Sequence, residues 1–225
     1  RDGVELQFSF GEIGQADQSF LLEAVRAAAE HGAGVVNLAD TNGCLHPRQV
    51  GELVAAAVRT VEDLEGVTLG VHMHNDLGLA TAGSLSAIEA GARHVEVTVG
   101  GIGTRSGNAA LEEVVFALEA FRDTLGLEHN VRLDRLAPTC DLLTRLTGLA
   151  PHPNKPVLGK YAFYESRAPE IRRGLTERLQ ELLRDETVGR TPDLVISEQE
   201  MSRAGFEQQL EALGVEPGSV NLDKA

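Results

Sequence analysis

The first 120 residues alternate between short apolar stretches and longer segments in which apolar residues recur at helical spacing. The apolar stretches are marked by Phe8, Leu38, Val71 and Val97, which lie 30, 33 and 26 residues apart. A repeat of roughly 30 residues that alternates strand and helix is typical of parallel βαβ units. The pattern therefore predicts four strands, each followed by a helix, with the helices at about 17–31, 47–61, 78–91 and 108–125.

Each predicted strand has one apolar and one polar face, because successive side chains point to opposite sides of a strand. An open sheet covered by helices on both faces has strands that are apolar throughout. Helices on one face and a polar interior on the other are typical of a (β/α) TIM barrel, whose active site lies at the C-terminal ends of its strands. The apolar set is Val4, Leu6, Phe8, Val36, Leu38, Val67, Leu69, Val71, Met73, Val95, Val97 and Val99, and the polar or small set is Glu5, Gln7, Ser9, Asn37, Ala39, Thr41, Thr68, Gly70, His72, His74, His94, Glu96 and Thr98.

A complete barrel of this class has about eight strands, so four strands predict an α/β fold that is the later half of a TIM barrel. We expect this half-barrel to span residues 1–129 as the catalytic domain. From residue 130 to 225 helical periodicity replaces the strand pattern, at roughly 132–148, 168–186 and 197–213, which predicts an α-helical subdomain. A loop rich in Pro, His and Gly, from Pro151 to Gly159, separates the first two of these helices.

Composition and charge narrow the classes of function. Hydrophobic residues make up 42% of the chain and charged residues 24%, as in folded soluble proteins. The net charge of −14 would repel a nucleic-acid backbone, and no apolar run approaches the ~20 residues of a membrane span. Two cysteines, no signal-peptide pattern and a first residue, Arg1, that is not Met predict a cytoplasmic location and a segment of a longer chain.

The most specific chemical feature is the pair His72 and His74 at the end of the third predicted strand. Residues two apart in a strand point the same way and lie ~6.6 Å apart. Imidazoles at that spacing can converge on one cation at ~2.1 Å per bond. The alternative is a polar layer of the barrel without metal, but two histidines at the lumen end of one strand favour metal ligation.

Two further motifs lie at the ends of neighbouring predicted strands. The glycine-rich loop, residues 98–108, contains four glycines before the helix that Asn108 is expected to cap. Its spacing does not match the dinucleotide fingerprint, so ordinary tight-turn glycines and a phosphate loop remain equal alternatives. The segment Asp40-Thr41-Asn42-Gly43 is explained by an Asx-type turn when taken alone.

Together these segments resemble the DRE-TIM metallolyases, a family that includes isopropylmalate, homocitrate and citramalate synthases, with hydroxymethylglutaryl-CoA lyase and ketoacid aldolases as relatives. The resemblance runs from Val4 to about Leu118 and extends, more weakly, to a linker at residues 154–163. The motifs that carry it are Asp40-Thr41-Asn42-Gly43, His72-Met73-His74-Asn75-Asp76 with Gly78-Leu79-Ala80, and Gly101-Ile102-Gly103-x-Arg105-x-Gly107-Asn108.

The resemblance implies a metal-dependent acyltransferase, working as a homodimer or with the other half of its barrel. It would condense acetyl-CoA with a 2-oxo acid in amino-acid biosynthesis. His72 and His74 would bind a divalent cation (Zn, Mn, Co, Fe or Mg), and Asn108 would complete or support that site. Thr41 would hydrogen-bond the 2-oxo acid carboxylate, and Arg105 and Gly103 would lie beside the acyl-CoA.

The sequence departs from the family pattern at several functional positions. The Asp-Arg-Glu signature belongs to a first barrel strand that this sequence lacks, and Arg1-Asp2-Gly3 only imitates its letters. The acidic residue usual in the first visible strand falls on Gly11, with Glu12 beside it, and Thr104 stands where Glu is usual. A catalytic histidine of the linker is replaced by the run Tyr164-Glu165-Ser166-Arg167.

These departures leave Glu12 and Tyr164 as candidate bases for deprotonating acetyl-CoA. Glu12 is preferred because a carboxylate is ionised at neutral pH, whereas tyrosine has a pKa of about 10. Two alternatives to the synthase remain at this point. One is a related lyase that cleaves a carbon–carbon bond, and the other is a non-catalytic half-barrel subunit that needs a partner chain.

Overall fold

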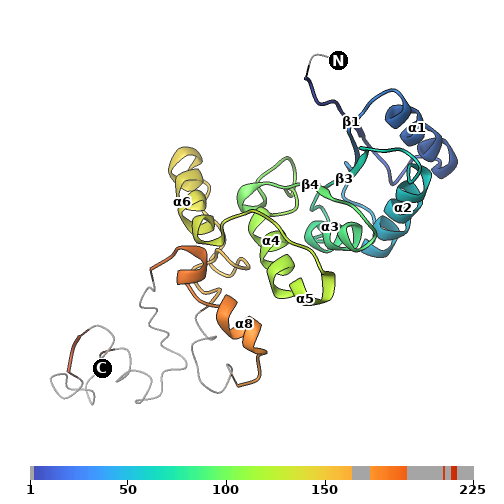
Figure 1. Ribbon diagram of the computed structural model, residues 1–225. Helices are drawn as coiled ribbons and strands as arrows, with labels where there is room; N and C mark the ends of the chain where they lie inside the picture. Colours follow the sequence, from blue (N-terminus) through green and yellow to red (C-terminus); the bar gives the residue numbers. More distant parts are fainter. Residues whose placement is uncertain (1–2, 164–172, 192–209, 211–213, 217–225) are drawn as a thin grey trace.

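The computed structural model describes residues 3–163, 173–191, 210 and 214–216, and contains a four-stranded parallel sheet in the order β1-β2-β3-β4 (Figure 1). A helix follows each strand, as the sequence pattern predicts. The strands are β1 (Gln7–Phe10), β2 (Val35–Asp40), β3 (Thr68–Met73) and β4 (His94–Glu96), and the helices are α1 (Gln18–Glu30), α2 (Pro47–Thr60), α3 (Ala80–Glu89) and α4 (Leu111–Ala120).

The register of the sheet brings the C-terminal strand ends to one edge. Asp40 of β2 pairs with Met73 of β3, and His72 pairs with Glu96 of β4. The first and last strands, β1 and β4, have a strand partner on one side only within the described residues. This arrangement is the half-barrel that the two-faced strands predict.

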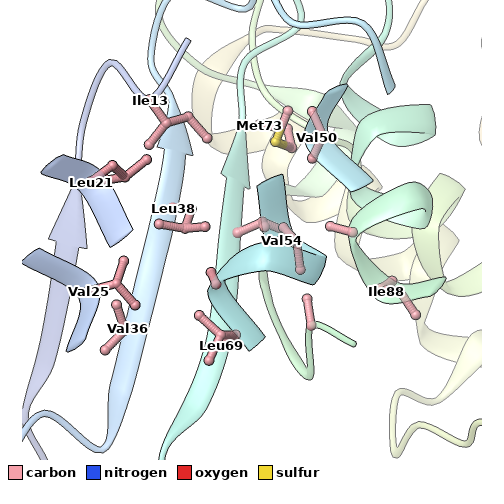
Figure 2. Packing of buried hydrophobic residues seen from close by; sticks show 14 of the residues in the cluster. Ile13, Leu21, Val25, Val36, Leu38, Val50, Val54, Leu69, Met73 and Ile88 are labelled. Carbon is pink, nitrogen blue, oxygen red and sulfur yellow. The ribbon is translucent and has the colours of Figure 1, made fainter. Parts of the chain in front are cut away.

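The main core lies between the sheet and its helices, as Figure 2 shows for Leu38, Val54 and their neighbours. Val36, Leu38 and Val71 of the apolar strand set are fully buried there. Burial of one such side chain contributes about 1.5–3 kcal/mol, which favours the orientation with the apolar set facing the helices. Because side chains alternate along a strand, the other set then points away from the helices. The opposite face keeps its polar side chains, including His72 and His74.

Local signals explain where α1 and α2 begin. Asp17 caps α1 by accepting the N–H of Phe20 at 3.0 Å, and Pro47 occupies the first turn of α2. The prediction that Asn108 caps its helix is wrong. The N-cap of α4 is Ala110, because residues 107–109 pair with the end of β3 instead of turning into the helix.

The outer face of β1 is exposed. Val4, Leu6 and Phe8 are 71%, 52% and 51% accessible, and Phe20 of the neighbouring helix α1 is 68% accessible. The strand begins at Gln7, so Val4 and Leu6 of the predicted apolar set lie before it. Helix α1 contacts β2, and Val4, Leu6 and Phe8 are not among the residues of the main core.

A second apolar cluster lies on the outer side of α4 and involves Phe116, Cys140 and Phe163. Its elements confirm the predicted helix at 132–148 and part of that at 168–186, whereas the helix predicted at 197–213 falls almost wholly outside the described residues. The single domain boundary at 129/130 stays a prediction.

The remaining elements of the described chain are helical. They are α5 (Arg122–Leu125), α6 (Leu136–Thr147) and α8 (Glu177–Leu182), with short 3₁₀ turns at Val99–Gly101, Leu133–Arg135 and Glu186–Val188. Among the described helices, none is both long and apolar enough to cross a membrane.

Candidate metal and substrate site

His72 and His74 point to the same place at the C-terminal end of β3. Their Nε2 atoms are 3.2 Å apart, which is close enough for both to bond one cation at ~2.1 Å. Partial burial, with the nearby charges of His72 and Arg105, lowers the pKa of His74. A lowered pKa favours the neutral imidazole, which is the form that binds metals.

The position of His72 is supported from β4 and β1. Its Nδ1 lies 2.9 Å from Oε2 of Glu96, and the other carboxylate oxygen of Glu96 accepts a hydrogen bond from Gln7 Nε2 at 2.5 Å. Three strands thus converge on one imidazole. Carboxylates that hold the second nitrogen of a ligating histidine orient the ring and raise its basicity.

Asn108 lies beside His74 because the backbone pairs them. The two residues form an antiparallel bridge, the Asn75 N–H donates to the Gly107 carbonyl at 2.9 Å, and the Ala109 N–H donates to the Met73 carbonyl at 2.9 Å. Within the part of the chain that the structure describes, the Oδ1 atom of Asn108 is buried without a hydrogen-bond partner. A buried amide oxygen without a donor suits a cation.

The donor set therefore fits a divalent metal. Among the described residues no group of three or more His, Cys, Asp or Glu side chains is placed to hold an ion. The candidate site consists instead of two imidazoles and one amide oxygen, and the remaining positions would be open. An open position is what a catalytic metal site needs in order to bind substrate.

Close packing requires two glycines of the glycine-rich loop, Gly103 and Gly107. A Cβ on Gly107, whose φ is 86°, would lie 2.0 Å from the Gly101 carbonyl oxygen, and one on Gly103 would lie 2.6 Å from Nδ2 of Asn108. Gly103 thus packs directly against the candidate metal ligand. Its predicted contact with acyl-CoA stays a prediction.

Arg105 joins three loops at the C-terminal edge of the sheet. Its guanidinium contacts both carboxylate oxygens of Asp76, at 2.7 and 2.9 Å, and donates to the Thr41 carbonyl at 2.5 Å. The hydrogen bonds from Arg105 lower the pKa of Asp76. Arg105 has a positive φ of 55°, which is uncommon for a residue with a side chain. Its predicted place beside acyl-CoA is not tested by these contacts.

Asp40, Thr41 and Glu12 meet at the end of β2. Asp40 is 1% exposed, and its side chain accepts the Leu45 N–H at 2.9 Å, five residues on. An Asx turn would bond the backbone two residues on, so the segment is not the turn that the sequence predicts; the Gly43 N–H instead donates to the Asp40 backbone carbonyl at 3.0 Å. The Glu12 N–H donates to Oγ1 of Thr41 at 3.0 Å, so the backbone brings these two candidate residues together. The Glu12 side chain is exposed and its φ is 55°. The other candidate base, Tyr164, lies outside the described residues.

A comparison with protein families identifies the family of this chain. The model of the HMGL-like family matches residues 1–143. The chain belongs to the HMGL-like family. This match confirms the resemblance to DRE-TIM metallolyases, and it includes all seven predicted site residues: Glu12, Thr41, His72, His74, Gly103, Arg105 and Asn108.

The curated relatives extend the similarity beyond the barrel. The chain is 39% identical over 220 residues to 2-isopropylmalate synthase 1 of Caldanaerobacter subterraneus subsp. tengcongensis, covering 96% of this chain and 55% of the relative. It is 40% identical over 211 residues to 2-isopropylmalate synthase of Pyrococcus furiosus, covering 93% and 42%. The chain therefore spans about half the length of these relatives.

Solved structures support the fold. An HMG-CoA lyase from Acinetobacter baumannii, solved with coenzyme A and 3-methylmalate, has a TM-score of 0.56 at 24% identity over 66% of this chain and 50% of its own. The HMG-CoA lyase of Pseudomonas aeruginosa has a TM-score of 0.56 at 20% identity over 65% and 51%. At these identities the likeness is one of fold.

Sequence reasoning missed two residues of this site. The strand pattern predicts that Glu96 lies on the polar face but assigns it no partner, and it identifies Asp76 only as part of a motif. The available signal for Glu96 was strand parity, since it lies on the same face as His72 of the adjacent strand. No comparable local signal pairs Asp76 with Arg105, which is 29 residues away.

Proposed function

We propose that this chain carries the metal-binding half of an acyltransferase that condenses acetyl-CoA with a 2-oxo acid, as in a 2-isopropylmalate synthase. The observation that carries the proposal is the 3.2 Å approach of the His72 and His74 Nε2 atoms beside the unpartnered amide oxygen of Asn108. Membership of the HMGL-like family and the relatives named 2-isopropylmalate synthase support it.

The product in the names of these relatives, 2-isopropylmalate, indicates which 2-oxo acid would react with acetyl-CoA. Loss of a methyl proton from acetyl-CoA lets that carbon bond to the ketone carbon of 3-methyl-2-oxobutanoate, and the ketone oxygen then takes up a proton. Hydrolysis of the thioester by water releases the CoA thiol and leaves 2-isopropylmalate. Every atom is supplied by the two substrates and water.

A divalent cation held by His72, His74 and Asn108 would polarise the ketone as a Lewis acid. Zn, Mn, Co, Fe and, with more oxygen ligands, Mg are all compatible with this donor set. Side chains would bind the substrate carboxylate and remove the methyl proton. The Thr41 hydroxyl, which accepts the Glu12 N–H, keeps its own proton free to donate to the substrate carboxylate.

Glu12 is our candidate for the base that removes the methyl proton. Its side chain is exposed and its backbone N–H contacts Thr41, at the edge where the two substrates would meet in the complete site. Arg105 and Gly103 would lie along the acyl-CoA. A carbon–carbon lyase could use the same metal ligands, but the relatives at 39% and 40% identity favour condensation.

The test is metal content and activity of the whole protein. We expect His72→Ala and His74→Ala each to abolish condensation, measured as CoA thiol release with a panel of 2-oxo acids, because each removes a metal ligand. His31→Ala is the matched control, since His31 is exposed and bonds only to the Ala27 carbonyl of its own helix. Unchanged metal content in the double variant, measured by elemental analysis, would reject the site.

A further inference from the structure

Glu112 is a buried charged residue outside the candidate metal site. It lies in the first turn of α4, is 1% exposed, and its Oε2 accepts the Gly100 N–H at 2.9 Å. Its other oxygen lies 3.4 Å from Nζ of Lys155, in the linker. Lys155 also contacts Glu113 at 2.6 Å, so one lysine bridges two adjacent carboxylates.

The Gly100 contact continues to Asn108 through one further hydrogen bond. Gly100 and Gly101 have φ values of 69° and 72°, and the Gly101 carbonyl accepts the Asn108 N–H at 3.0 Å. Gly107 crosses the same carbonyl so closely that no side chain fits. We expect a shift of Gly100 to be passed to Asn108 through the Gly101 carbonyl, which has no spare room on the side of Gly107.

Helix stability alone does not account for a buried glutamate here. A carboxylate in a first turn is favoured by the helix dipole, but Glu113 already provides one there and also binds Lys155. An apolar side chain of similar size would avoid the cost of burying a charge. Of Glu112, Glu113 and Lys155, only Glu112 accepts the Gly100 N–H.

We propose that Glu112, with Lys155 as its counter-ion, is a positioning residue that holds the glycine-rich loop so that Asn108 lies beside His74. The inference rests on the proposed metal site for its purpose, although the loop geometry can be measured without metal. It also gives the linker a role, since Lys155 contacts the residue that holds the glycine-rich loop.

Two substitutions of Glu112 separate positioning from bulk packing. Glu112→Leu removes the acceptor of the Gly100 N–H, whereas Glu112→Gln keeps an acceptor oxygen without the charge. In metal-free whole protein, we expect Glu112→Leu to speed backbone hydrogen–deuterium exchange in peptides covering 98–110 by about tenfold or more, with little change in peptides covering 18–60. Glu112→Gln should stay near wild type, and Glu113→Leu, which leaves Gly100 untouched, is the matched control.

Metal titration provides the second measurement. The Kd for Zn²⁺ or Mn²⁺ should rise about 10- to 100-fold in Glu112→Leu, the range typical of residues that orient ligands. Exchange at the wild-type rate, or faster exchange throughout the chain, would overturn the proposal. If the wild type binds neither metal, the proposed function fails while the exchange result still decides the role of Glu112.

A second variant, Lys155→Met, tests the proposal independently if Glu112→Leu does not fold. Lys155→Met leaves the Gly100 acceptor in place but removes the counter-ion of Glu112, so exchange in 98–110 should increase. The double variant Lys155→Met with Glu112→Gln should exchange more slowly than Lys155→Met alone, because no charge is then buried. Wild-type exchange in Lys155→Met would show that the ion pair does not hold the loop.

Discussion

The guanidinium of Arg105 contacts the carboxylate of Asp76 at 2.7 and 2.9 Å, and this ion pair joins the loops that follow β4 and β3. The same guanidinium bonds the Thr41 carbonyl after β2. Three strand ends that carry candidate site residues are thus held by one side chain. Both partners remain accessible to water, so the pair positions loops more than it stabilises the fold.

Arg105→Lys tests this positioning. Lysine keeps the charge but cannot make two parallel bonds to Asp76. We expect the KM for acetyl-CoA to rise about tenfold, because loop misplacement weakens substrate positioning, with little change in the thermal midpoint. Arg48→Lys is the control, since its ion pair with Glu52 is on the surface of α2. A large loss of thermal stability in Arg105→Lys would show instead that the pair is structural.

Glu96→Gln tests the support of His72. Glutamine preserves the shape of the side chain and a bond to Gln7, but it removes the carboxylate that faces His72 Nδ1. Metal affinity should fall about 10- to 100-fold, measured by titrating the metal-free whole protein with Zn²⁺ or Mn²⁺. Glu52→Gln, at an exposed position of α2, should bind as the wild type does. Equal affinities in the two variants would remove Glu96 from the site.

Glu12→Gln tests the proposed base. Loss of a general base typically slows proton transfer by ~10²- to 10⁴-fold, so deuterium exchange into acetyl-CoA should slow by that factor while 2-oxo acid binding is nearly unchanged. Exchange at the wild-type rate would exclude Glu12. If the wild type shows no exchange with any 2-oxo acid, a lyase or a non-catalytic subunit becomes the better hypothesis.

The parts of this structure that follow a repeating pattern could be predicted from sequence. Alternation along a strand places His72 and His74 on one face and Leu38 and Val71 on the other, because side-chain direction has a fixed period. The order of the four βα units follows from spacing in the same way. These predictions need no information about distant contacts.

The parts that depend on contacts between distant segments could not be predicted. Asn108 has the residue type of an N-cap and is preceded by glycines, so local rules place it at a helix start. Its backbone instead pairs with the end of β3, 34 residues earlier in the chain, and the helix begins at Leu111. The contact of Lys155 with Glu112 has the same origin, since neither residue carries a local signal for the other.

The exposed face of β1 leads to a prediction about the chain on its own. Val4, Leu6, Phe8 and Phe20 are exposed apolar side chains, and within the described residues β1 has a strand partner on one side only. Exposed apolar residues and open strand edges promote association. We expect residues 1–225 expressed alone to self-associate or aggregate. Phe8→Lys with Phe20→Lys should reduce this in light scattering and ultracentrifugation.

The control for that experiment is Leu146→Lys. Leu146 is 76% exposed, but it lies on α6, away from the sheet edge. An equal effect of this variant would show that association does not depend on the edge. A wild-type chain that is a monodisperse monomer with cooperative melting would contradict the half-barrel itself.

The Glu112–Lys155 pair predicts how stability depends on pH. Burial raises the pKa of Glu112 above its usual range, while Lys155 acts in the opposite direction. An unfolded glutamate ionises near pH 4.3, so between that pH and the raised pKa the folded protein holds the extra proton. Stability from this group is then present below about pH 4.3 and is lost as pH rises through the folded pKa.

Lys155→Met should enlarge this loss because it removes the cation that favours the ionised carboxylate. The urea midpoint of the Lys155→Met whole protein should therefore fall more between pH 5 and pH 8 than that of the wild type, by the equivalent of about 1–3 kcal/mol. Adding Glu112→Gln should abolish the extra fall, since position 112 then has no proton to lose. Parallel pH profiles for Lys155→Met and the wild type would mean that Lys155 does not stabilise the Glu112 carboxylate, and that the linker is held by Glu113 alone.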